Sequence, residues 1–489
     1  MSCFRILQRM MLSGVLLPCF LVSLFAYGGH AMDTEKKTDF TVVPFGSGGQ
    51  LKMIYDRRQR PQAIYMNGKV YIGYNGGAPL DATEREKTYP FVIAFDPDTK
   101  SVSSPIQLDT KGSRDQHYCP VVWADNNDFL HILFGCHRTP GTHLVSDKMA
   151  SIGNSVEDWS AGPEIRNSLS YPTVYHISDN RQVIYFRTGE HRSSWSYLIS
   201  DDEGKTWSGP ENDVTDLNMG GETAQVDDPI DLNEWSSYHT CLPSKDGKFL
   251  HVVFCSYDDN KKNVPEKFYN PRYETKKNLG LKYNLYYVKI NLQTHEVKNF
   301  DGETVKAPID IDNANAKCMI WDTEWRGAGV PPDIAIDGND NPVFLHVLSE
   351  DTPETYNYYY VRYVNNEWKQ TVIAPATDDW NSCYLRRDDG GGALYAYLIV
   401  GDHKFIKGKL GKMDSRGGGD IEEWVSTDNG NRWEKVRDLI PSAPEYDGWK
   451  FNNIQPIKDE KGNIKEGMFL FYGWKDSELS KAKGFLIVE

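Results

Sequence analysis

The chain has 489 residues, 39% of them hydrophobic, which is enough to bury a large core. Its 54 Lys and Arg stand against 69 Asp and Glu, and the net charge of −15 excludes the globally basic surface of a nucleic-acid-binding protein. Aromatic residues make up 12% of the chain, which excludes a disordered protein, and 41 Gly and 25 Pro are typical of short strands joined by tight turns.

The first 31 residues have the pattern of a secretory signal peptide. Arg5 and Arg9 give a positive start, Met10–Tyr27 is apolar, and Gly29-His30-Ala31 is a small-x-small cleavage site. A retained membrane anchor is the alternative, but the apolar run contains Ser, Gly and Pro and stops at small residues. We therefore expect residues 1–31 to be removed and the mature chain to be secreted or periplasmic, without membrane attachment.

A repeated hairpin pattern runs through the rest of the chain. Three copies place Phe-Leu-His before a run of aliphatic residues, with the histidines at His131, His251 and His346, and four weaker copies complete the series. Repeats at this spacing indicate the blades of a β-propeller. The seven predicted hairpins cover residues 61–74, 119–136, 171–185, 241–255, 332–348, 383–399 and 453–472.

Further strands and turns support the same architecture. Period-two or aromatic-rich runs follow four of the hairpins, at residues 89–95, 194–200, 283–289 and 356–364, and predict third strands. Ser200–Trp207 and Ser426–Trp433 resemble the Asp-box turns of sialidase-type propellers. We predict an all-β fold, a seven-bladed β-propeller with Asp-box hairpins, in one domain over residues 32–489. Residues 258–279 and 299–326 would be insertions, and a pair of β-sandwiches, the alternative, leaves seven similar hairpins unexplained.

Cysteine and metal chemistry stay open at the sequence level. Cys119 and Cys136 stand across one predicted hairpin, which favours a cross-strand disulfide, while a zinc site from these cysteines with His117 and His137 is the alternative. A calcium site near Asp227-Asp228 is equally open. We expect the chemistry to require no cofactor and leave a structural calcium or zinc ion as an option.

Polar residues stand where the hairpins begin and end, which in a propeller is the mouth of the central channel. No pair of neighbouring carboxylates stands at matching positions, as an acid and a nucleophile for glycoside hydrolysis would need. β-Elimination at a uronic acid instead needs a cation for the carboxylate, a base and an acid, and His, Tyr and Arg can supply them. The polar set comprises His117, His137, Arg138, Tyr171, Arg187, His191, Arg192, Tyr238, His239 and Arg326.

Two other groups of polar residues are given structural or surface roles. His131, His251 and His346 share one repeat position and are interpreted as structural blade residues. Arg57, Arg58 and Arg60 are interpreted as a solvated surface run, with binding of an anionic substrate as the alternative.

Four short motifs resemble those of BNR-type propeller polysaccharide lyases, above all the ulvan lyases. They are Asp115-x-His117, Cys136-His137, Ser170-Tyr171-Pro172 and Tyr185-x-Arg187-x-Gly189, all within residues 113–192. The resemblance implies that His117 is a base, Tyr171 an acid or both acid and base, and Arg187 the group that neutralises the uronate. It also implies that His137, Tyr238 and His239 belong to the site. Tyr118 departs from the family, whose members often have Asn at that position.

The function expected from this resemblance is a secreted lyase. Its substrate would be a uronic-acid-containing, ulvan-like polysaccharide, expected to be sulfated, and the product an unsaturated uronate. Arg138, His191, Arg192 and Arg326 would join His137, Tyr238 and His239 in binding the substrate. A propeller glycoside hydrolase (a sialidase, or a rhamnosidase acting next to glucuronate) and a non-catalytic glycan-binding propeller are the alternatives. We expect a monomer whose partner is an anionic polysaccharide, with no nucleic acid.

Overall fold

The computed structural model divides the chain into a unit of Met1–Asp39 and a unit of Phe40–Glu489. The expected signal peptide, residues 1–31, lies outside the described residues, and everything below concerns the second unit. The structure describes residues 40–47, 54–77, 87–178, 180–190, 192–217, 235–258, 270, 272–274, 282–388, 392–400, 417–475 and 482–489.

The fold is built from antiparallel hairpins that form seven blades, numbered here in chain order. Blade 1 consists of β2 (Ala63–Met66), β3 (Lys69–Gly77), β4 (Thr88–Asp96), β5 (Ser101–Val102) and β6 (Ile106–Gln107). Blade 2 consists of β7 (Val121–Ala124), β8 (Leu130–Phe134), β10 (Thr142–Ser146) and β11 (Trp159–Ala161). Blade 3 consists of β12 (Leu169–Ser178), β13 (Arg181–Arg187) and β14 (Trp195–Ser200), with β9 (His137–Thr139) on the other edge of β12.

The second half of the ring repeats this plan. Blade 4 consists of β15 (Trp235–Pro243), β16 (Phe249–Asp258), β17 (Lys282–Asn291) and β18 (Val297–Lys298), with β19 (Met319–Trp321) and β20 (Gly327–Ala328) added to β17. Blade 5 consists of β21 (Asp333–Ile336), β22 (Pro342–Ser349), β23 (Tyr356–Val364) and β24 (Glu367–Ala376). Blade 6 consists of β25 (Cys383–Arg387), β26 (Leu394–Val400), β27 (Asp420–Ser426) and β28 (Glu434–Asp438). Blade 7 consists of β29 (Trp449–Asp459), β30 (Ile464–Lys475), β31 (Lys483–Val488) and β1 (Thr41–Ser47).

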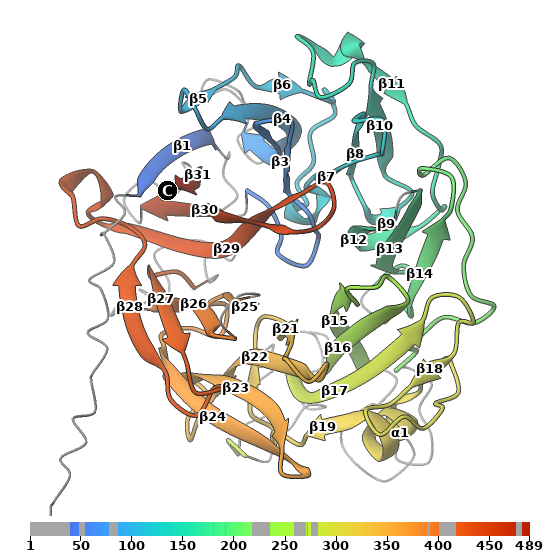
Figure 1. The fold of residues 1–489 in the computed structure, drawn as a ribbon, viewed down its shortest axis with the longest axis vertical. Coiled ribbons are helices and arrows are strands. Elements are labelled where there is room, and N and C mark those ends of the chain that lie inside the picture. Colours follow the sequence, from blue (N-terminus) through green and yellow to red (C-terminus); the bar gives the residue numbers. More distant parts are fainter. Residues whose placement is uncertain are drawn as a thin grey trace, which may run out of the picture. The chain divides into compact units, whose positions relative to one another are not determined.

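The seven-bladed propeller predicted from the repeats is confirmed. Each predicted hairpin forms the first two strands of a blade, and the sheets surround a common centre with β7, β12, β15, β21 and β25 on the inside (Figure 1). Blades 1 and 7 are joined into one nine-stranded sheet because Ile64 and Tyr65 of β2 pair in parallel with Lys458 and Asp459 of β29. The ring closes where β1 pairs with β31, so strands from both ends of this unit share one blade.

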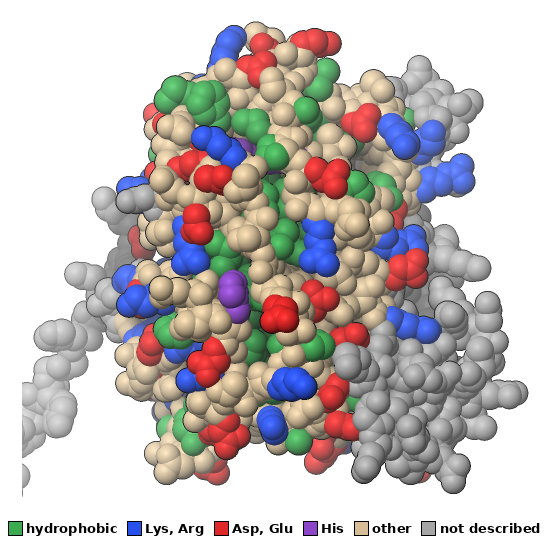
Figure 2. All heavy atoms as spheres, turned by 90° about the vertical axis from the view of Figure 1, so that its right-hand side faces the viewer, with side chains coloured by type: hydrophobic (Ala, Val, Ile, Leu, Met, Phe, Trp, Pro, Cys, Tyr) green, Lys and Arg blue, Asp and Glu red, His purple; other side chains and the backbone are tan. Residues whose placement is uncertain are grey.

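Apolar side chains between neighbouring blades form the core. Between blades 2 and 3, for example, Val121 and Leu133 pack with Val174, Ile184 and Phe186. Such contacts between sheet faces explain why the strands read as apolar on alternate or on all positions. The side view in Figure 2 shows acidic and basic side chains interspersed over the outside of the ring.

The predicted Asp-box segments form matching turns at the ends of the third strands β14 and β27. Ser200 Oγ accepts a hydrogen bond from Gly204 N at 2.8 Å, and Ser426 Oγ accepts one from Gly430 N at 2.7 Å. Both glycines have positive φ angles, +78° and +83°, which side chains with a Cβ disfavour. These turns lie at the outside of the blades and leave the channel mouth to other residues.

The disulfide expected between Cys119 and Cys136 is wrong, because all six cysteines of the described chain are free. Cys119 packs against Ile54, Tyr55 and Tyr472, whereas Cys136 packs against the apolar residues between blades 2 and 3. The two thiols therefore face different blade interfaces. The same separation removes the zinc site that would use both cysteines.

Helices are short in the described residues. The predicted insertion at 299–326 contains α1 (Ile311–Asn313), η5 (Ala314–Cys318) and the added strand β19, while most of 258–279 lies outside the described residues. The remaining helical turns are η1 (Gln116–Tyr118), η2 (Val156–Asp158) and η6 (Pro444–Tyr446). No helix in the described residues has the length and apolar character needed to span a membrane.

Candidate active site

Strand register brings the motif residues together at one end of the channel. η1 precedes β7 and β9 follows β8, so the hairpin of blade 2 places His117 beside His137. Ser170 of β12 then pairs both with His137 of β9 and with Arg187 of β13. Residues that are up to 70 positions apart in the sequence thus meet at the mouth, as the resemblance implied.

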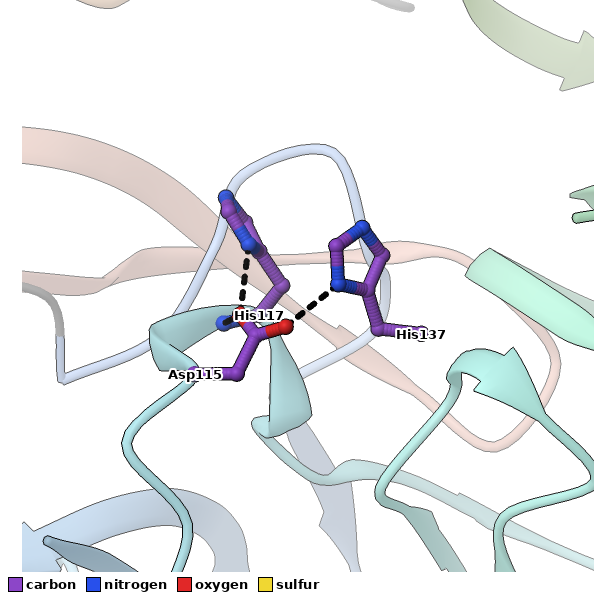
Figure 3. A group of neighbouring side chains, drawn as sticks. All are labelled: Asp115, His117 and His137. Atoms are coloured by element: carbon purple, nitrogen blue, oxygen red, sulfur yellow. Dashed lines mark hydrogen bonds and ion pairs between the residues drawn. The ribbon is translucent and has the colours of Figure 1, made fainter. Parts of the chain in front are cut away.

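One carboxylate holds two histidines in the same orientation. Asp115 Oδ1 lies 2.7 Å from His117 Nδ1, and its Oδ2 lies 2.5 Å from His137 Nδ1 (Figure 3). Because a carboxylate only accepts, each Nδ1 donates a proton to Asp115. The ring centres lie 4.8 Å apart; His137 Nε2 has no hydrogen-bond partner among the described residues, and His117 Nε2 lies 3.8 Å from Asp56 Oδ2. Asp115 therefore orients both imidazoles and leaves their Nε2 atoms available to a ligand.

The electrostatic surroundings keep His117 neutral near pH 7. Burial is the largest influence and lowers the pKa of His117 to about 4, with Arg58 acting in the same direction against the hydrogen bond to Asp115. Burial acts to raise the pKa of Asp115, but the hydrogen bonds from His117 and His137 hold it far below its usual range. Asp115 is therefore an ionised carboxylate, and the His117 imidazole that donates to it is neutral.

Tyr171 and Arg187 present polar groups that the protein leaves without partners. Both side chains are buried, and neither the Tyr171 hydroxyl nor the three guanidinium nitrogens of Arg187 make a hydrogen bond within the described residues. The Arg187 guanidinium carbon lies 4.7 Å from the centre of the Tyr171 ring. Buried polar groups are normally satisfied, so these unpaired donors point to a ligand. An anion with an adjacent oxygen acceptor would satisfy both.

Tyr171 lies within reach of both histidines. Its ring centre is 5.6 Å from that of His117 and 5.5 Å from that of His137. Its φ angle is +56°, an uncommon backbone conformation for a tyrosine. Burial raises the pKa of the Tyr171 hydroxyl and outweighs the opposite effects of Arg58 and Arg187. The phenol therefore stays protonated and can donate its proton.

The interpretation of Arg57, Arg58 and Arg60 as a surface run is wrong. All three precede β2. Arg57 and Arg58 are buried, and Arg58 pairs with Asp56. The Arg60 side chain, which pairs with Asp333, is 19% exposed. Arg58 binds Asp56 through two hydrogen bonds of 2.8 and 2.6 Å and lies 4.7 Å from the Tyr171 ring centre. Sequence patterning missed this because a run of Arg before a strand normally faces water.

Arg58 makes Asp56 part of the site. Burial acts to raise the pKa of Asp56, but Arg58 lowers it to about 2. Asp56 Oδ2 lies 3.8 Å from His117 Nε2, outside hydrogen-bonding distance. The His117 imidazole therefore has Asp56 beside its Nε2 and Asp115 beside its Nδ1, and both carboxylates are ionised.

Tyr238 joins the site, whereas His239 does not. The Tyr238 ring lies 5.7 Å from that of Tyr171, with the Lys282 ammonium 4.7 Å from its centre. His239 is stacked on Trp195 at 4.4 Å, and its two nitrogens bond Tyr185 and Ser237. Successive residues of a strand point to opposite faces, which explains the different fates of these two neighbours.

The remaining predicted binding residues lie at the edge of this group. Arg138 is half-exposed and pairs with Glu190 at 2.8 Å, and Arg192 lies in the following loop. Arg326 contacts Trp321 and Tyr359, a separate aromatic group of blades 4 and 5. His191 lies outside the described residues.

Among the repeat histidines, His131 bonds His143 and His251 bonds Tyr287, while His346 is fully buried.

Asp115, His117 and His137 could also bind a metal ion. One ligand-type atom from each of Asp115, His117 and His137 lies within 4.8 Å of the others, and imidazole with carboxylate suits zinc. In the present arrangement the Asp115 oxygens are bonded to both Nδ1 atoms. The Asp227-Asp228 segment considered for calcium lies outside the described residues.

Comparisons with known proteins find similar chains among the ulvan lyases. An ulvan lyase of Alteromonas sp. (strain LOR) is 26% identical over 284 residues, 54% of this chain and 53% of that enzyme. An ulvan lyase of Nonlabens ulvanivorans is 21% identical over 407 residues, 78% and 76% of the two chains. The chain thus spans about half the length of the first of these relatives and three quarters of the second.

Solved structures show the same fold. A polysaccharide lyase described as a PL25 ulvan lyase matches with a TM-score of 0.68 at 18% identity, over 90% of this chain and 94% of that one. The same values hold for that lyase bound to -[GlcA(1-4)Rha3S]-. A family model described as BNR repeat-containing family member matches residues 81–376, more than half of the sequence. The protein therefore belongs to the BNR repeat-containing family.

Proposed function

We propose that this protein is a lyase that cleaves a uronate-containing polysaccharide by β-elimination. The observation that carries the proposal is the group of polar atoms without hydrogen-bond partners at the mouth: the Arg187 guanidinium, the Tyr171 hydroxyl and His137 Nε2, with His117 beside them. Together they provide a cation, an acid and a base around one point. These are the three groups that elimination at a uronic acid needs.

The relatives support the same substrate class. Two matched enzymes are ulvan lyases, and one solved ulvan lyase holds a glucuronate linked to a sulfated rhamnose. By analogy, the substrate of this protein is an ulvan-like polymer of glucuronate and sulfated rhamnose. An expected export signal at residues 1–31 fits action on an extracellular polymer.

Arg187 would receive the substrate carboxylate. The guanidinium is fully buried and has no partner among the described residues, so a carboxylate would form charge-assisted hydrogen bonds with it. Neutralising the carboxylate makes the proton on the neighbouring C5 more acidic, because the negative charge that develops there spreads onto the carboxylate. Arg187 thus acts on the developing enolate.

His117 and Tyr171 would divide the proton transfers. The low pKa of His117 leaves Nε2 unprotonated, so it can take the C5 proton, and the raised pKa of Tyr171 keeps its hydroxyl protonated, so it can give a proton to the leaving oxygen. The C5–H electrons form the C4=C5 double bond while the C4–O bond breaks. The oxygen takes the Tyr171 proton, and proton exchange with water restores both side chains. The products are a new chain end and an unsaturated uronate.

The charge states of the carboxylates argue against hydrolysis. A glycoside hydrolase needs one protonated carboxyl group to act as an acid. Asp56 has a pKa of about 2 and Asp115 one far below its usual range, so both are ionised at working pH. Each is also bonded to a cation or an imidazole, which leaves neither free as a nucleophile.

Incubation with ulvan tests the proposal directly. The expected result is a rise in ultraviolet absorbance from the new C4=C5 double bond, together with unsaturated oligosaccharides in the mass spectrum. New reducing ends without that absorbance would show hydrolysis instead. Binding without any change in polymer size would show a lectin. Either of these two results across a panel of uronate polymers overturns the proposal.

A further inference from the structure

A second cavity lies at the opposite end of the central channel. The space between its walls, counted out into the open solvent, is about 790 Å³. Trp123, Tyr175 and Gln455 line it from the second halves of the inner strands β7, β12 and β29. His117 and Tyr171, by contrast, stand before β7 and near the start of β12. The four residues from Tyr171 to Tyr175 span about 13 Å of strand, so this cavity is separate from the proposed active site.

The cavity contains an ammonium group that forms no ion pair with a described residue. Lys458 lines the wall, and its ammonium lies 5.6 Å from the centre of the Tyr175 ring. Burial and the neighbouring Arg60 lower its pKa to about 8, so it remains mostly charged at neutral pH. A cation in this setting favours an anionic ligand.

The acids nearest to Lys458 are already engaged. Asp333 accepts hydrogen bonds from Arg60 at 3.3 Å and from Leu385 N at 2.9 Å. Asp459 accepts from Lys461 N at 2.9 Å and from Asn463 N at 2.8 Å, which closes the turn between β29 and β30. Asp333 and Asp459 act to raise the pKa of Lys458, but neither forms an ion pair with its ammonium. Glu460, which lines the cavity with Asp459, forms no ion pair with Lys458 among the described residues either.

A buried amide adds a second, independent sign of a ligand. Gln455 is 8% exposed and lines the cavity, and its Nε2 has no hydrogen-bond partner. Such a donor costs free energy unless a ligand or water accepts its bond. Tyr175, Tyr384 and Trp123 are the aromatic residues among those that line the cavity. A lining of aromatic residues with a few polar groups is typical of sites for small ligands.

We propose that this cavity is a second saccharide site, which binds an acidic sugar residue away from the site of cleavage. The carboxylate of a uronate would lie between the Lys458 ammonium and the Gln455 amide, with the sugar ring against Tyr175 or Tyr384. The site rests on the proposed function, since its ligand is a residue of the same polymer. Holding a second stretch of polymer would raise the affinity of the whole protein for long chains.

Glucuronate, which has no glycosidic bond to cleave, is the probe for this site. Calorimetric titration is done in an Arg187→Gln background, which weakens binding at the channel mouth. The Lys458→Gln variant in this background is expected to bind glucuronate roughly ten- to hundredfold more weakly, because one charge-assisted hydrogen bond is lost. Lys461→Gln is the matched control, since it removes an equal charge from the same turn at a residue that does not line the cavity.

Three outcomes decide the inference. Weaker binding in Lys458→Gln, with Lys461→Gln unchanged and both variants melting alike, supports it. Equal affinity of the two variants for glucuronate overturns it, and so does binding of inorganic sulfate as tight as that of glucuronate. The absorbance assay on unaltered protein is read separately, so an inactive protein that binds glucuronate through Lys458 would refute only the lyase activity.

Discussion

Two histidine–tyrosine groups contact the Trp195 indole. In one, Tyr171 stacks on Trp195 at 6.4 Å and lies near His117 and His137; in the other, His239 stacks on it at 4.4 Å and bonds Tyr185 at 2.7 Å. Both groups are largely buried and use the same residue types. The two groups differ in their hydrogen bonds. His239 bonds Tyr185 and Ser237, whereas the Tyr171 hydroxyl has no hydrogen-bond partner among the described residues.

This contrast separates structural from reactive polar groups. A buried hydroxyl or imidazole that makes all of its hydrogen bonds within the protein stabilises the fold, and it has no free donor or acceptor for a ligand. At the mouth, only the Nδ1 atoms of His117 and His137 are bonded, and they are bonded to the group that orients them. The atoms without partners are thereby left for a ligand.

The sharpest test removes the tyrosine hydroxyl from each of these two groups. Tyr171→Phe is expected to lower kcat by about 10²–10⁴-fold, because the acid for the leaving oxygen is lost. Tyr185→Phe, the matched control, is expected to keep its activity and lose about 1 kcal/mol of unfolding free energy with its bond to His239. Initial rates on ulvan and chemical denaturation measure the two effects. Equal losses of activity would mean that Tyr171 is as structural as Tyr185.

Arg187 is expected to contribute to activity but not to the free energy of unfolding. Arg187→Met should lower kcat/KM by about 10²–10³-fold, since the charge that stabilises the enolate is lost. Its free energy of unfolding should not fall, because the native guanidinium is buried without hydrogen bonds. Kinetics and denaturation are measured on the same preparation. A clear loss of stability would show that Arg187 serves the fold.

Asp115 is expected to act through the two histidines. Asp115→Asn should lower kcat about 10- to 100-fold, because an amide no longer holds both Nδ1 protons and orients both Nε2 atoms. Asp125→Asn is the matched control, since Asp125 lies 3.6 Å from His131, a histidine inside blade 2. Activity that depends equally on both aspartates would contradict a special role for Asp115.

The smallest expected effect is a shift in pH dependence. The base must be neutral, so kcat/KM should rise with pH through the His117 pKa of about 4 and then level off. In Arg58→Gln the loss of a neighbouring cation, which also unpairs Asp56, raises that pKa, so the acid limb should move up by about one unit. Circular dichroism at each pH confirms that the protein stays folded. A limb that does not move would exclude Arg58 from setting the His117 pKa.

The fold was accessible from the sequence because each blade repeats a local pattern. Phe-Leu-His with its flanking aliphatic residues marked the second strands at His131, His251 and His346, and turn residues marked the hairpins. The closure of blade 7 by β1 was not accessible, since pairing between residues 41–47 and 483–488 leaves no short-range trace. The positions of the Cys119 and Cys136 thiols could not be predicted for the same reason. Their facing positions on one hairpin do not determine which blade interface each thiol enters.

The motif residues of the candidate site were likewise accessible, but their neighbours were not. His117, His137, Tyr171, Arg187 and Tyr238 meet at the mouth as expected. Arg58 was placed on the surface and His239 in the site, and both assignments reversed. The preference of Arg for water holds on average, but here Arg58 is buried in the segment that precedes β2. His239 is a common residue type in functional sites, but here both of its nitrogens are bonded to Tyr185 and Ser237.

The sequence by itself determined the seven hairpins, the all-β class and the residue types of the reaction, because these follow from local spacing and side-chain chemistry. The tertiary structure decided which polar atoms remain unpaired. It joined Asp115 to two imidazoles, brought Arg58 to Tyr171 and left Arg187 and Lys458, at opposite ends of the channel, without an ion pair to a described residue. Hydrogen bonding and burial depend on segments distant in sequence, so only the closed ring could determine which groups stay free to act.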